Sequence, residues 1–423
     1  MYDMGNSTGI FGSNKQNKMK ILFITGLYPK ESEPMLRDMS GKVGLSNAAN
    51  AFQWCVIEGL FDNDVDFDVV SYPFLVGYPR FQRMYSPKGD IMYKGKKIGV
   101  MQPYNTFFLI KDLSKRYRLR HFVSKWLKAN YSKKEKIVLM TYTPASCFIP
   151  ALIPFKKKYP NLVISSIITD LVDDLISPTF HLSFPKYIQA KLEQKIVWAS
   201  YKHIDKFILL TEAMADKIPQ SKNNHIVVEG IANKVIESYL PLKASELKTL
   251  LYTGTIQQFT GILDLVEAFK NTTNSMFRLI ICGGGECQDE LQTMISDDAR
   301  IEYKGILTRE EVLNLQKQCT ALINPRKPTV SLTKYSFPSK TMEYLASGTP
   351  MIGYQLEGIP AEYYPYIFTP KDLSNAAMTD CIDRVLMFSP EVLRKHGINA
   401  REFIKENKEA KSQVKKIIKY LKV

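Results

Sequence analysis

The sequence predicts an α/β protein made of two Rossmann-like domains, and three observations support this fold class. Short apolar runs of the kind found in buried parallel strands alternate with helical stretches, six or seven times in each half of the chain. The chain has 423 residues, which is too long for one average domain and suits two or three. No repeat period that would indicate a solenoid is present.

The domain boundaries follow from changes in composition along the chain. The first 18 residues are rich in Gly, Ser and Asn, so we expect a flexible tail. A stretch of mixed charge near Pro241 is typical of an interdomain linker. The expected segments are the tail (1–18), an N-terminal domain (19–238), the linker (239–248), a C-terminal domain (249–400) and a last helix (401–423).

The composition is that of a globular cytoplasmic protein, with 45% hydrophobic and 23% charged residues. We expect no transmembrane helix, because no run of about 18 apolar residues occurs. We expect no signal peptide, because the first 18 residues lack an apolar core. None of the six cysteines has Cys-x-x-Cys spacing, which favours buried free thiols over disulfides or zinc.

The chain carries a formal net charge of +15. Such a charge attracts nucleic acid, anionic lipid or phosphorylated small molecules, and a merely solubilising surface is the alternative. No aromatic-basic or zinc-finger pattern occurs, so no nucleic-acid partner is expected. Each basic residue near an anionic membrane contributes roughly 1 kcal/mol of attraction. We therefore expect a cytoplasmic protein that can make peripheral contact with the inner face of the cell membrane.

The N-terminal domain begins as a Rossmann-like unit. A strand is expected at 20–25, followed by a loop that contains Gly41 and Gly44 and by a helix from about 46 to 60. The strict Gly-x-Gly-x-x-Gly pattern is absent, so no nicotinamide cofactor is expected. The further strands are expected at 65–72, 136–141, 161–168 and 206–210, and the further helices at 112–130, 144–158 and 184–200.

Three carboxylates follow the strand at 161–168, at the edge where open α/β sheets bind ligands. They are Asp170, Asp173 and Asp174. They can face a ligand, or they can cap the next helix. A divalent cation is disfavoured because these three carboxylates form no Asp-x-Asp pattern, and we predict no metal site.

The C-terminal domain begins a second unit of the same kind. A strand at 249–253 leads into a loop with Gly254 and Thr255, and a helix is expected at 261–271. The next strand runs into 283–285, three glycines that let the backbone approach a ligand closely. The remaining expected elements are strands at 277–282 and 301–303, a turn at Gly305, a helix capped by Thr308 with Glu311 in a Thr-x-x-Glu box, and a last helix from about Val392.

The stretch 321–363 carries the strongest functional pattern. A short strand is followed by Arg326, and a later helix begins at Ser339, its expected N-cap, and ends at Gly348. Free N–H groups and the helix dipole favour a phosphate at such a helix start.

Lys340 and Glu343 lie in the first turns of that helix. Lys340 adds a full positive charge to the helix start, and Glu343 lies one turn later, where it can accept hydrogen bonds from a ribose. The pair predicts a site for a nucleoside diphosphate. The alternative is an ordinary α/β helix with a surface lysine and a surface glutamate.

The same stretch resembles retaining glycosyltransferases of family 4, which have the GT-B fold of two Rossmann-like domains facing each other across a cleft. Their motif has two glutamates separated by seven residues and followed by Ala-x-Gly-x-Pro. Glu343 matches the second glutamate, and Ala346, Gly348 and Pro350 match the residues after it. Tyr335 stands at the position of the first glutamate, in a Tyr-Ser-Phe-Pro-Ser-Lys sequence similar to a bacterial polysaccharide-type subgroup.

The resemblance implies a hexosyltransferase-type enzyme. It would move a sugar from a nucleoside diphosphate-sugar, with retention of configuration, to a saccharide or lipid-linked acceptor in bacterial surface polysaccharide synthesis. The N-terminal domain would hold the acceptor and the C-terminal domain the nucleotide-sugar, and the last helix would cross back to the first domain. No cofactor is implied, and no metal is expected.

The resemblance also implies roles for individual residues. The expected catalytic residues are Lys340, Asp170 and Tyr335. The expected donor-binding residues are Glu343, Ser339, Ser336, Arg326, Gly254, Thr255, Thr260, Gly283, Gly284, Gly305 and Ile306. The residues expected to approach the acceptor or the donor diphosphate are Gly41, Lys42 and Gly44.

Two other functions fit the same pattern. A non-catalytic sugar-nucleotide-binding subunit of a transferase complex would explain the missing first glutamate. It would also explain Thr255 and Thr260, which stand where standard relatives have Arg and Lys. A sugar-nucleotide 2-epimerase has the same fold, but it needs several acid–base carboxylates and histidines in the cleft. The chain has only five histidines, which argues against this function.

Overall fold

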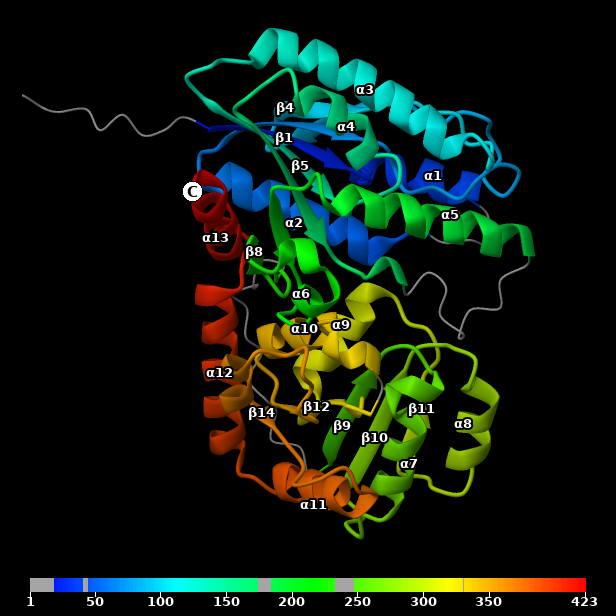
Figure 1. Cartoon of the computed structure of the whole chain (residues 1–423). Coiled ribbons are helices and arrows are strands. Elements are labelled where there is room, and N and C mark those ends of the chain that lie inside the picture. The colour runs from blue at the N-terminus through cyan, green and yellow to red at the C-terminus, as the bar shows by residue number, and fades with distance from the viewer. Residues whose placement is uncertain (1–18, 41–44, 174–183, 233–246, 330) are drawn as a thin grey trace, which may run out of the picture.

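The computed structural model describes residues 19–40, 45–173, 184–232, 247–329 and 331–423, which form two α/β domains (Figure 1). In the described part of the chain, one sheet has eight strands in the order β3-β4-β2-β1-β5-β6-β7-β8. The other has six strands in the order β11-β10-β9-β12-β13-β14. The predicted fold class of two Rossmann-like domains is confirmed.

The N-terminal sheet is parallel apart from its edge strand β3, which runs antiparallel to β4. In register, Phe23 of β1 lies opposite Val69 of β2 and Met140 of β5. The strands are β1 (Met19–Thr25), β2 (Asp66–Ser71), β3 (Gly89–Tyr93), β4 (Lys96–Met101), β5 (Lys136–Tyr142), β6 (Leu162–Ile168), β7 (Lys206–Leu209) and β8 (His225–Val227).

Helices cover both faces of this sheet, which is why its central strands β1, β5 and β6 are apolar at most positions. The helices of this domain are α1 (Glu33–Ser40), α2 (Asn47–Asp62), α3 (Lys111–Asn130), α4 (Ile149–Lys156), α5 (Phe184–Tyr201) and α6 (Met214–Lys217). Leu22 and Ile24 of β1 pack on the side of α1, α3, α4 and α5, whereas Ile21 and Phe23 pack on the side of α2.

Helix α1 replaces part of the expected glycine loop after β1. Leu36 and Met39 are buried in the core, and Arg37 donates to Glu33 at 2.8 Å, so a short amphipathic helix forms there. Because charged and polar residues make up half of this helix, Leu36 and Met39 give no clear helical pattern in the sequence. The expected tail (1–18) and the loop residues Gly41, Lys42 and Gly44 lie outside the described residues.

The C-terminal sheet is wholly parallel in its described strands. They are β9 (Lys248–Thr253), β10 (Phe277–Cys282), β11 (Ile301–Tyr303), β12 (Ala321–Asn324), β13 (Met351–Gly353) and β14 (Ile367–Phe368). The helices are α7 (Ile262–Lys270), α8 (Gln288–Ile295), α9 (Arg309–Gln318), α10 (Ser339–Ser347), α11 (Asn375–Leu386), α12 (Pro390–Asn407) and α13 (Ala410–Lys422). Short 3-10 helices are η1 (Lys30–Ser32), η3 (Pro219–Ser221), η4 (Gln258–Thr260), η5 (Ser331–Lys334) and η6 (Ala361–Tyr366).

Two of the three predicted helix ends near the candidate site are confirmed. Thr308 and Glu311 form the capping box of α9, and Gly348 ends α10 in the left-handed conformation, with φ 78°. The prediction that Ser339 caps α10 is wrong, because Pro338 occupies the cap position and Ser339 is the first helical residue. Proline has no side-chain acceptor, so the first N–H groups of α10 receive no side-chain cap.

The expected single last helix is two helices. Helix α12 runs along the C-terminal domain, and α13 lies against α2 of the N-terminal domain (Figure 1). Val414, Ile417 and Leu421 of α13 are buried in the N-terminal core. The chain turns at Lys408, whose carbonyl accepts a hydrogen bond from the Ala232 N–H at 2.8 Å.

A buried ion pair joins the domains at this turn. Lys408 is 0% exposed, and its ammonium lies 2.5 Å from a Glu229 oxygen and also contacts Glu362. Glu229 accepts a further hydrogen bond from the Tyr363 hydroxyl at 2.7 Å and one from the Gln413 amide at 3.3 Å. Burial alone would raise the pKa of Glu229, but the Lys408 ammonium and the Tyr363 hydroxyl hold it below its ordinary value.

Two expectations from composition can be compared with the structure. In the described residues, no helix combines the length and the apolar character needed to cross a bilayer. All six cysteines are buried and none is in a disulfide, as predicted.

We predict that Lys408→Met destabilises the protein by about 3–5 kcal/mol, because it leaves the Glu229 carboxylate buried without its cation. Urea denaturation followed by circular dichroism measures the effect. The double variant Glu229→Gln/Lys408→Met removes both charges and should recover most of the loss. A double variant no more stable than Lys408→Met would show that the uncompensated charge is not the cause.

Candidate active site

The order of the C-terminal strands fixes where a ligand can bind. From β9 the chain adds β10 and β11 on one side of the sheet, and it then returns to add β12, β13 and β14 on the other side. The loops after β9 and β12 therefore run in opposite directions and leave a crevice at the carboxyl edge. Residues 254–261 follow β9, and residues 325–338 lead from β12 to α10. Five of the eleven predicted donor-binding residues lie in these two loops: Gly254, Thr255, Thr260, Arg326 and Ser336.

Gly254, Gly283 and Gly305, which are predicted to bind the donor, lie in neighbouring turns at this edge. The Gly283 N–H donates to the Gly305 carbonyl at 2.8 Å. A Cβ added to Gly283 would lie 1.7 Å from the Gly254 carbonyl oxygen, so no side chain fits there. Ile306 follows on the outer side, is 82% exposed, and its side chain lies next to Gly284. A flat apolar group such as a nucleobase can approach this backbone.

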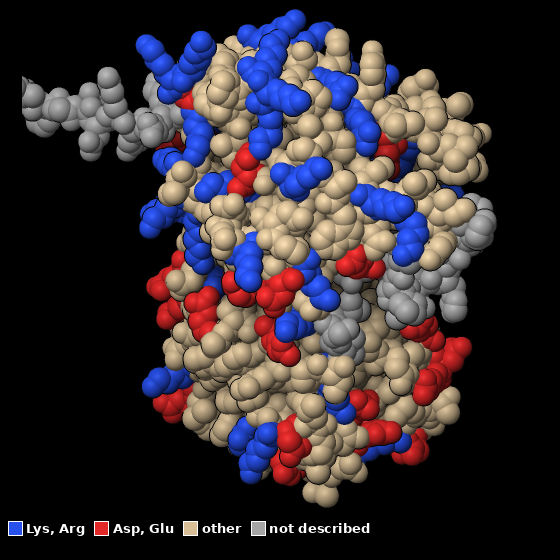
Figure 2. Space-filling model, viewed as in Figure 1, with Lys and Arg blue, Asp and Glu red and all other residues tan. Residues whose placement is uncertain are grey.

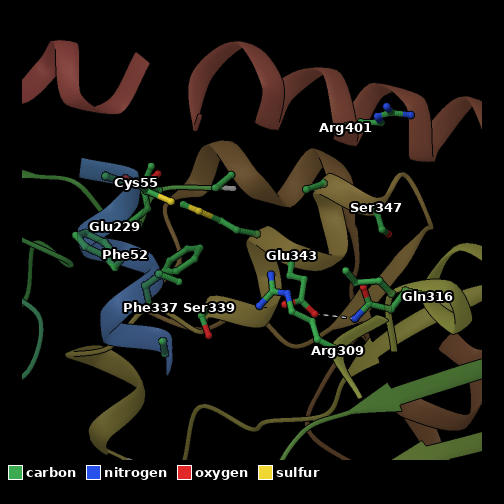
Figure 3. Close-up of a pocket in the computed structure, with 18 of the residues that line it drawn as sticks. Phe52, Cys55, Glu229, Arg309, Gln316, Phe337, Ser339, Glu343, Ser347 and Arg401 are labelled. Atoms are coloured by element: carbon green, nitrogen blue, oxygen red, sulfur yellow. Dashed lines mark hydrogen bonds between the residues drawn. The ribbon is translucent and has the colours of Figure 1, made fainter. Parts of the chain in front are cut away.

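A cavity of about 330 Å³ lies between the two domains, next to the start of α10. Phe52 and Cys55 of α2 line it from the N-terminal domain, and Ser339 and Glu343 of α10 line it from the C-terminal domain (Figure 3). Arg401 of α12 forms part of the wall. Glu343 therefore faces the interdomain space and not the outer surface.

Glu343 is held by two donors. The Lys340 ammonium lies 3.0 Å and the Gln316 amide nitrogen 2.7 Å from the same Glu343 oxygen; a dashed line marks the second bond in Figure 3. Burial alone would raise the pKa of Glu343, but the Lys340 ammonium and the Gln316 amide hold it below its ordinary value. The two residues expected to grip a diphosphate and a ribose thus form an ion pair with each other.

Arg309 and Gln316 of α9 are site residues that sequence reasoning missed. Both line the cavity, and Arg309 lies beside Glu343 in Figure 3 and helps to keep it ionised. Only the capping box at the start of α9 was recognised. The signal that could have found them is their spacing of seven residues, which puts both on one face of a helix.

Arg326 is a cation for which the described part of the chain provides no acidic partner. It follows β12 at the crevice, its guanidinium lies 5.6 Å from the centre of the Phe259 ring, and burial lowers its pKa. Its Nε is buried and has no hydrogen-bond partner among the described residues, which also provide no ion pair for its guanidinium. An anionic ligand would supply the missing acceptor.

The two threonines of the loop after β9 differ in their freedom to donate. The Thr260 hydroxyl donates to the Gln257 carbonyl at 2.6 Å, so its proton is used within the loop. The Thr255 side chain is exposed, and its carbonyl accepts from the Tyr252 hydroxyl at 2.7 Å.

Tyr335 and Ser336 lie where the C-terminal domain touches the N-terminal domain. The Thr211 hydroxyl donates to the Lys334 carbonyl at 3.1 Å, and Tyr335 packs against the N-terminal core, 5.5 Å below the Lys217 ammonium. The structure thus directs Tyr335 to the first domain, and no described contact joins it to Lys340.

Asp170 is exposed directly after β6, at the carboxyl edge of the N-terminal sheet. No hydrogen bond or ion pair links it to the described residues of α10. Asp173 instead accepts from Gln194 at 2.6 Å and from Trp198 at 3.0 Å, so it ties this turn to α5. Asp174 lies outside the described residues. In the described ranges no three His, Cys, Asp or Glu side chains gather to hold a metal.

Residues 247–387 match the family model described as glycosyl transferases group 1. The match runs from β9 to the end of α11 and includes every predicted donor-binding residue. No curated protein matches the sequence.

Solved structures of glycosyltransferases are similar over nearly the whole chain. Sucrose-phosphate synthase from Thermosynechococcus elongatus has a TM-score of 0.61 at 15% identity, covering 95% of this chain and 98% of that chain. The apo form of the lipopolysaccharide outer core galactosyltransferase WaaB has a TM-score of 0.58 at 14% identity, covering 95% and 99%. The Anabaena protein HepE, in complex with UDP, has a TM-score of 0.59 at 13% identity, covering 95% and 99%. These similarities confirm the predicted GT-B fold.

We predict that the stabilising effect of the Glu343 carboxylate depends on pH. Because its folded-state pKa lies below the ordinary value of 4.5, this contribution is present above that value and is lost as the pH falls through the lowered pKa. The melting temperature of Glu343→Gln should therefore fall below that of the unmodified protein at pH 7, and the gap should close in acid. Differential scanning fluorimetry across this range measures the gap.

Glu267→Gln is the matched control, because it removes the same charge from an exposed position on α7. A gap for Glu343→Gln that stays constant from neutral to acid pH would contradict the contacts made by Lys340 and Gln316.

Proposed function

We propose that the chain, which has the GT-B fold and matches the glycosyl transferases group 1 model over residues 247–387, moves a hexosyl group from a nucleoside diphosphate-sugar to a saccharide or lipid-linked acceptor. We further propose that the transfer retains the configuration of the sugar and serves bacterial surface polysaccharide synthesis. The nucleotide-sugar would bind to the C-terminal domain and the acceptor to the N-terminal domain.

The observation that carries the proposal is that Glu343 and Gln316 lie on the wall of the interdomain cavity, with Lys340 bonded to the same Glu343 oxygen. Glu343 is ionised and half-buried, so it can accept both hydroxyl protons of a ribose. The open start of α10 adjoins it, and its free N–H groups and Lys340 suit a diphosphate. The neighbouring Anabaena structure in complex with UDP supports a nucleotide donor.

Breaking the bond between sugar and diphosphate leaves negative charge on the diphosphate oxygens. Lys340 and the first N–H groups of α10 would stabilise this charge in the transition state. Arg326, whose buried Nε has no acceptor among the described residues, is a second cation for the same group. We assign no protein nucleophile, and retention would then follow if the acceptor attacks the face from which the diphosphate leaves.

Asp170 and Tyr335 remain candidates for the sugar end of the site. Tyr335 packs against the N-terminal core, and Asp170 is exposed directly after β6 of the N-terminal sheet. Closure of the two domains around a bound sugar would be needed to bring them to Lys340. The basic N-terminal domain supports an acceptor attached to a lipid, which the protein would meet by peripheral contact with the anionic inner face of the membrane (Figure 2).

The donor can be identified by thermal shift with UDP-, GDP- and other nucleotide-sugars, since a ligand that binds the folded state raises its melting point. With that donor, Lys340→Ala should lower kcat/KM for transfer roughly 10–100-fold, because one charged hydrogen bond to the leaving group is lost. Release of the nucleoside diphosphate measures the rate, and NMR of the product reports its anomeric configuration.

Lys270→Ala is the matched control, because Lys270 forms an ion pair with the exposed Asp297 at the C-terminal end of α7. Equal release of nucleotide by Lys340→Ala and Lys270→Ala would refute the role of Lys340. An inverted product would refute retention, and donor binding without transfer to any membrane acceptor would favour a non-catalytic binding subunit.

A further inference from the structure

The exposed apolar side chains of the protein are concentrated on one part of the N-terminal domain. Eleven of the twenty large apolar side chains that are exposed in the described chain come from three short segments, 78–85, 108–117 and 187–192. Leu109, Leu113 and Tyr117 are the most prominent, with 67%, 61% and 74% of their surface exposed. Concentrations of this kind mark an interaction surface.

The three segments form one continuous face. The Tyr78 N–H donates to the Thr106 carbonyl and the Thr106 N–H donates to the Met84 carbonyl, each at 2.8 Å, so the first two segments lie side by side. The Ser146 hydroxyl lies 3.3 Å from both Asp112 of α3 and Glu193 of α5, which joins the third segment to the second. Figure 1 shows the first turns of α3 and α5 on the same side of the domain. We call this surface the α3–α5 face.

The charge of the α3–α5 face is strongly positive. Residues 78–85, 107–120 and 187–195 include eight exposed or half-exposed Lys and Arg side chains, among them Arg120, Lys191 and Lys195. Their only carboxylates are Asp112 and Glu193, and both turn inward to Ser146. Figure 2 shows the same bias, with Lys and Arg gathered over the N-terminal domain.

An apolar centre beside basic side chains, with several tyrosines, is the chemistry that recognises the headgroup region of an anionic bilayer. Helix α3 shows the pattern along a single stripe: Leu113 and Tyr117 are followed by Arg120 and Lys128, all exposed. A second copy of the chain would bring the same positive charge against itself, so the charge favours a membrane.

We propose that the α3–α5 face is the membrane-docking surface of this protein and that its partner is a bilayer containing anionic lipid. Leu109, Leu113 and Tyr117 would enter the headgroup boundary, and the basic side chains would contact lipid phosphates. The face adjoins the carboxyl edge of the N-terminal sheet, because the chain leaves β4 and β6 at that edge before entering α3 and α5. An acceptor carried by a lipid could reach the cleft from there, a consequence that rests on the proposed function.

Co-sedimentation of the full chain with phosphatidylcholine vesicles, with or without phosphatidylglycerol, tests the proposal. The protein should bind the anionic vesicles and bind neutral ones far more weakly. Leu109→Glu/Leu113→Glu should lower binding about 10-fold or more at both low and high salt, because it removes apolar insertion. Lys191→Glu/Lys195→Glu should lower it at low salt, and the difference should shrink as salt screens the charges.

Met387→Glu is the matched control, because Met387 is also exposed but lies at the end of α11 in the C-terminal domain; its binding should be unchanged. Thermal shift with UDP or another bound nucleotide shows whether each variant is folded. Wild-type binding to vesicles in the Leu109→Glu/Leu113→Glu variant would overturn the proposal. A second result would also overturn it: neither protein binds vesicles, and size-exclusion chromatography shows a dimer for the unmodified protein and a monomer for this variant. Failure of the proposed function gives a different result: no nucleotide-sugar binds or reacts, but the protein still binds anionic vesicles.

Discussion

The buried contact between Lys408 and Glu229 is the constraint on which the relation of the two domains depends. Glu229 belongs to the last described segment of the first domain, Glu362 and Tyr363 to a 3-10 helix of the second, and Lys408 to the turn between α12 and α13. A buried charge is costly unless its partners are present, so closure of the domains must pivot about this contact without breaking it. Glu229 also lies in the wall of the cavity between α2 and α10, so the pivot adjoins the candidate site.

Much of the fold was predictable because its strands are buried on both faces. Such strands are apolar runs bounded by turn residues, and the runs at 20–25 and 277–282 correspond to β1 and β10. Short amphipathic segments were not predictable in this way, as α1 shows, because two buried apolar side chains in eight residues leave little periodicity. The turn at Lys408 was missed for another reason. A lysine is expected at the surface unless its buried partners are known, and Glu229 is 179 residues away in the chain.

The candidate site was predictable where one local segment makes it. The start of α10 contains Lys340 and Glu343 within four residues, so helical spacing alone brings them together. Arg309 and Gln316 come from α9 and meet Glu343 only through packing, which a single sequence does not reveal. The same limit applies to Tyr335, whose contact with the first domain depends on how the domains face each other.

Helix α13 has a consequence for the order of synthesis. Its side chains complete the hydrophobic core beneath β1, β2 and β5, yet the ribosome makes them after the whole second domain. Domains generally fold in the order in which they emerge. Here the leading domain must wait, with the apolar side of α2 uncovered, while the trailing domain is translated and folds. The trailing domain can thus be complete before the core of the leading domain is closed.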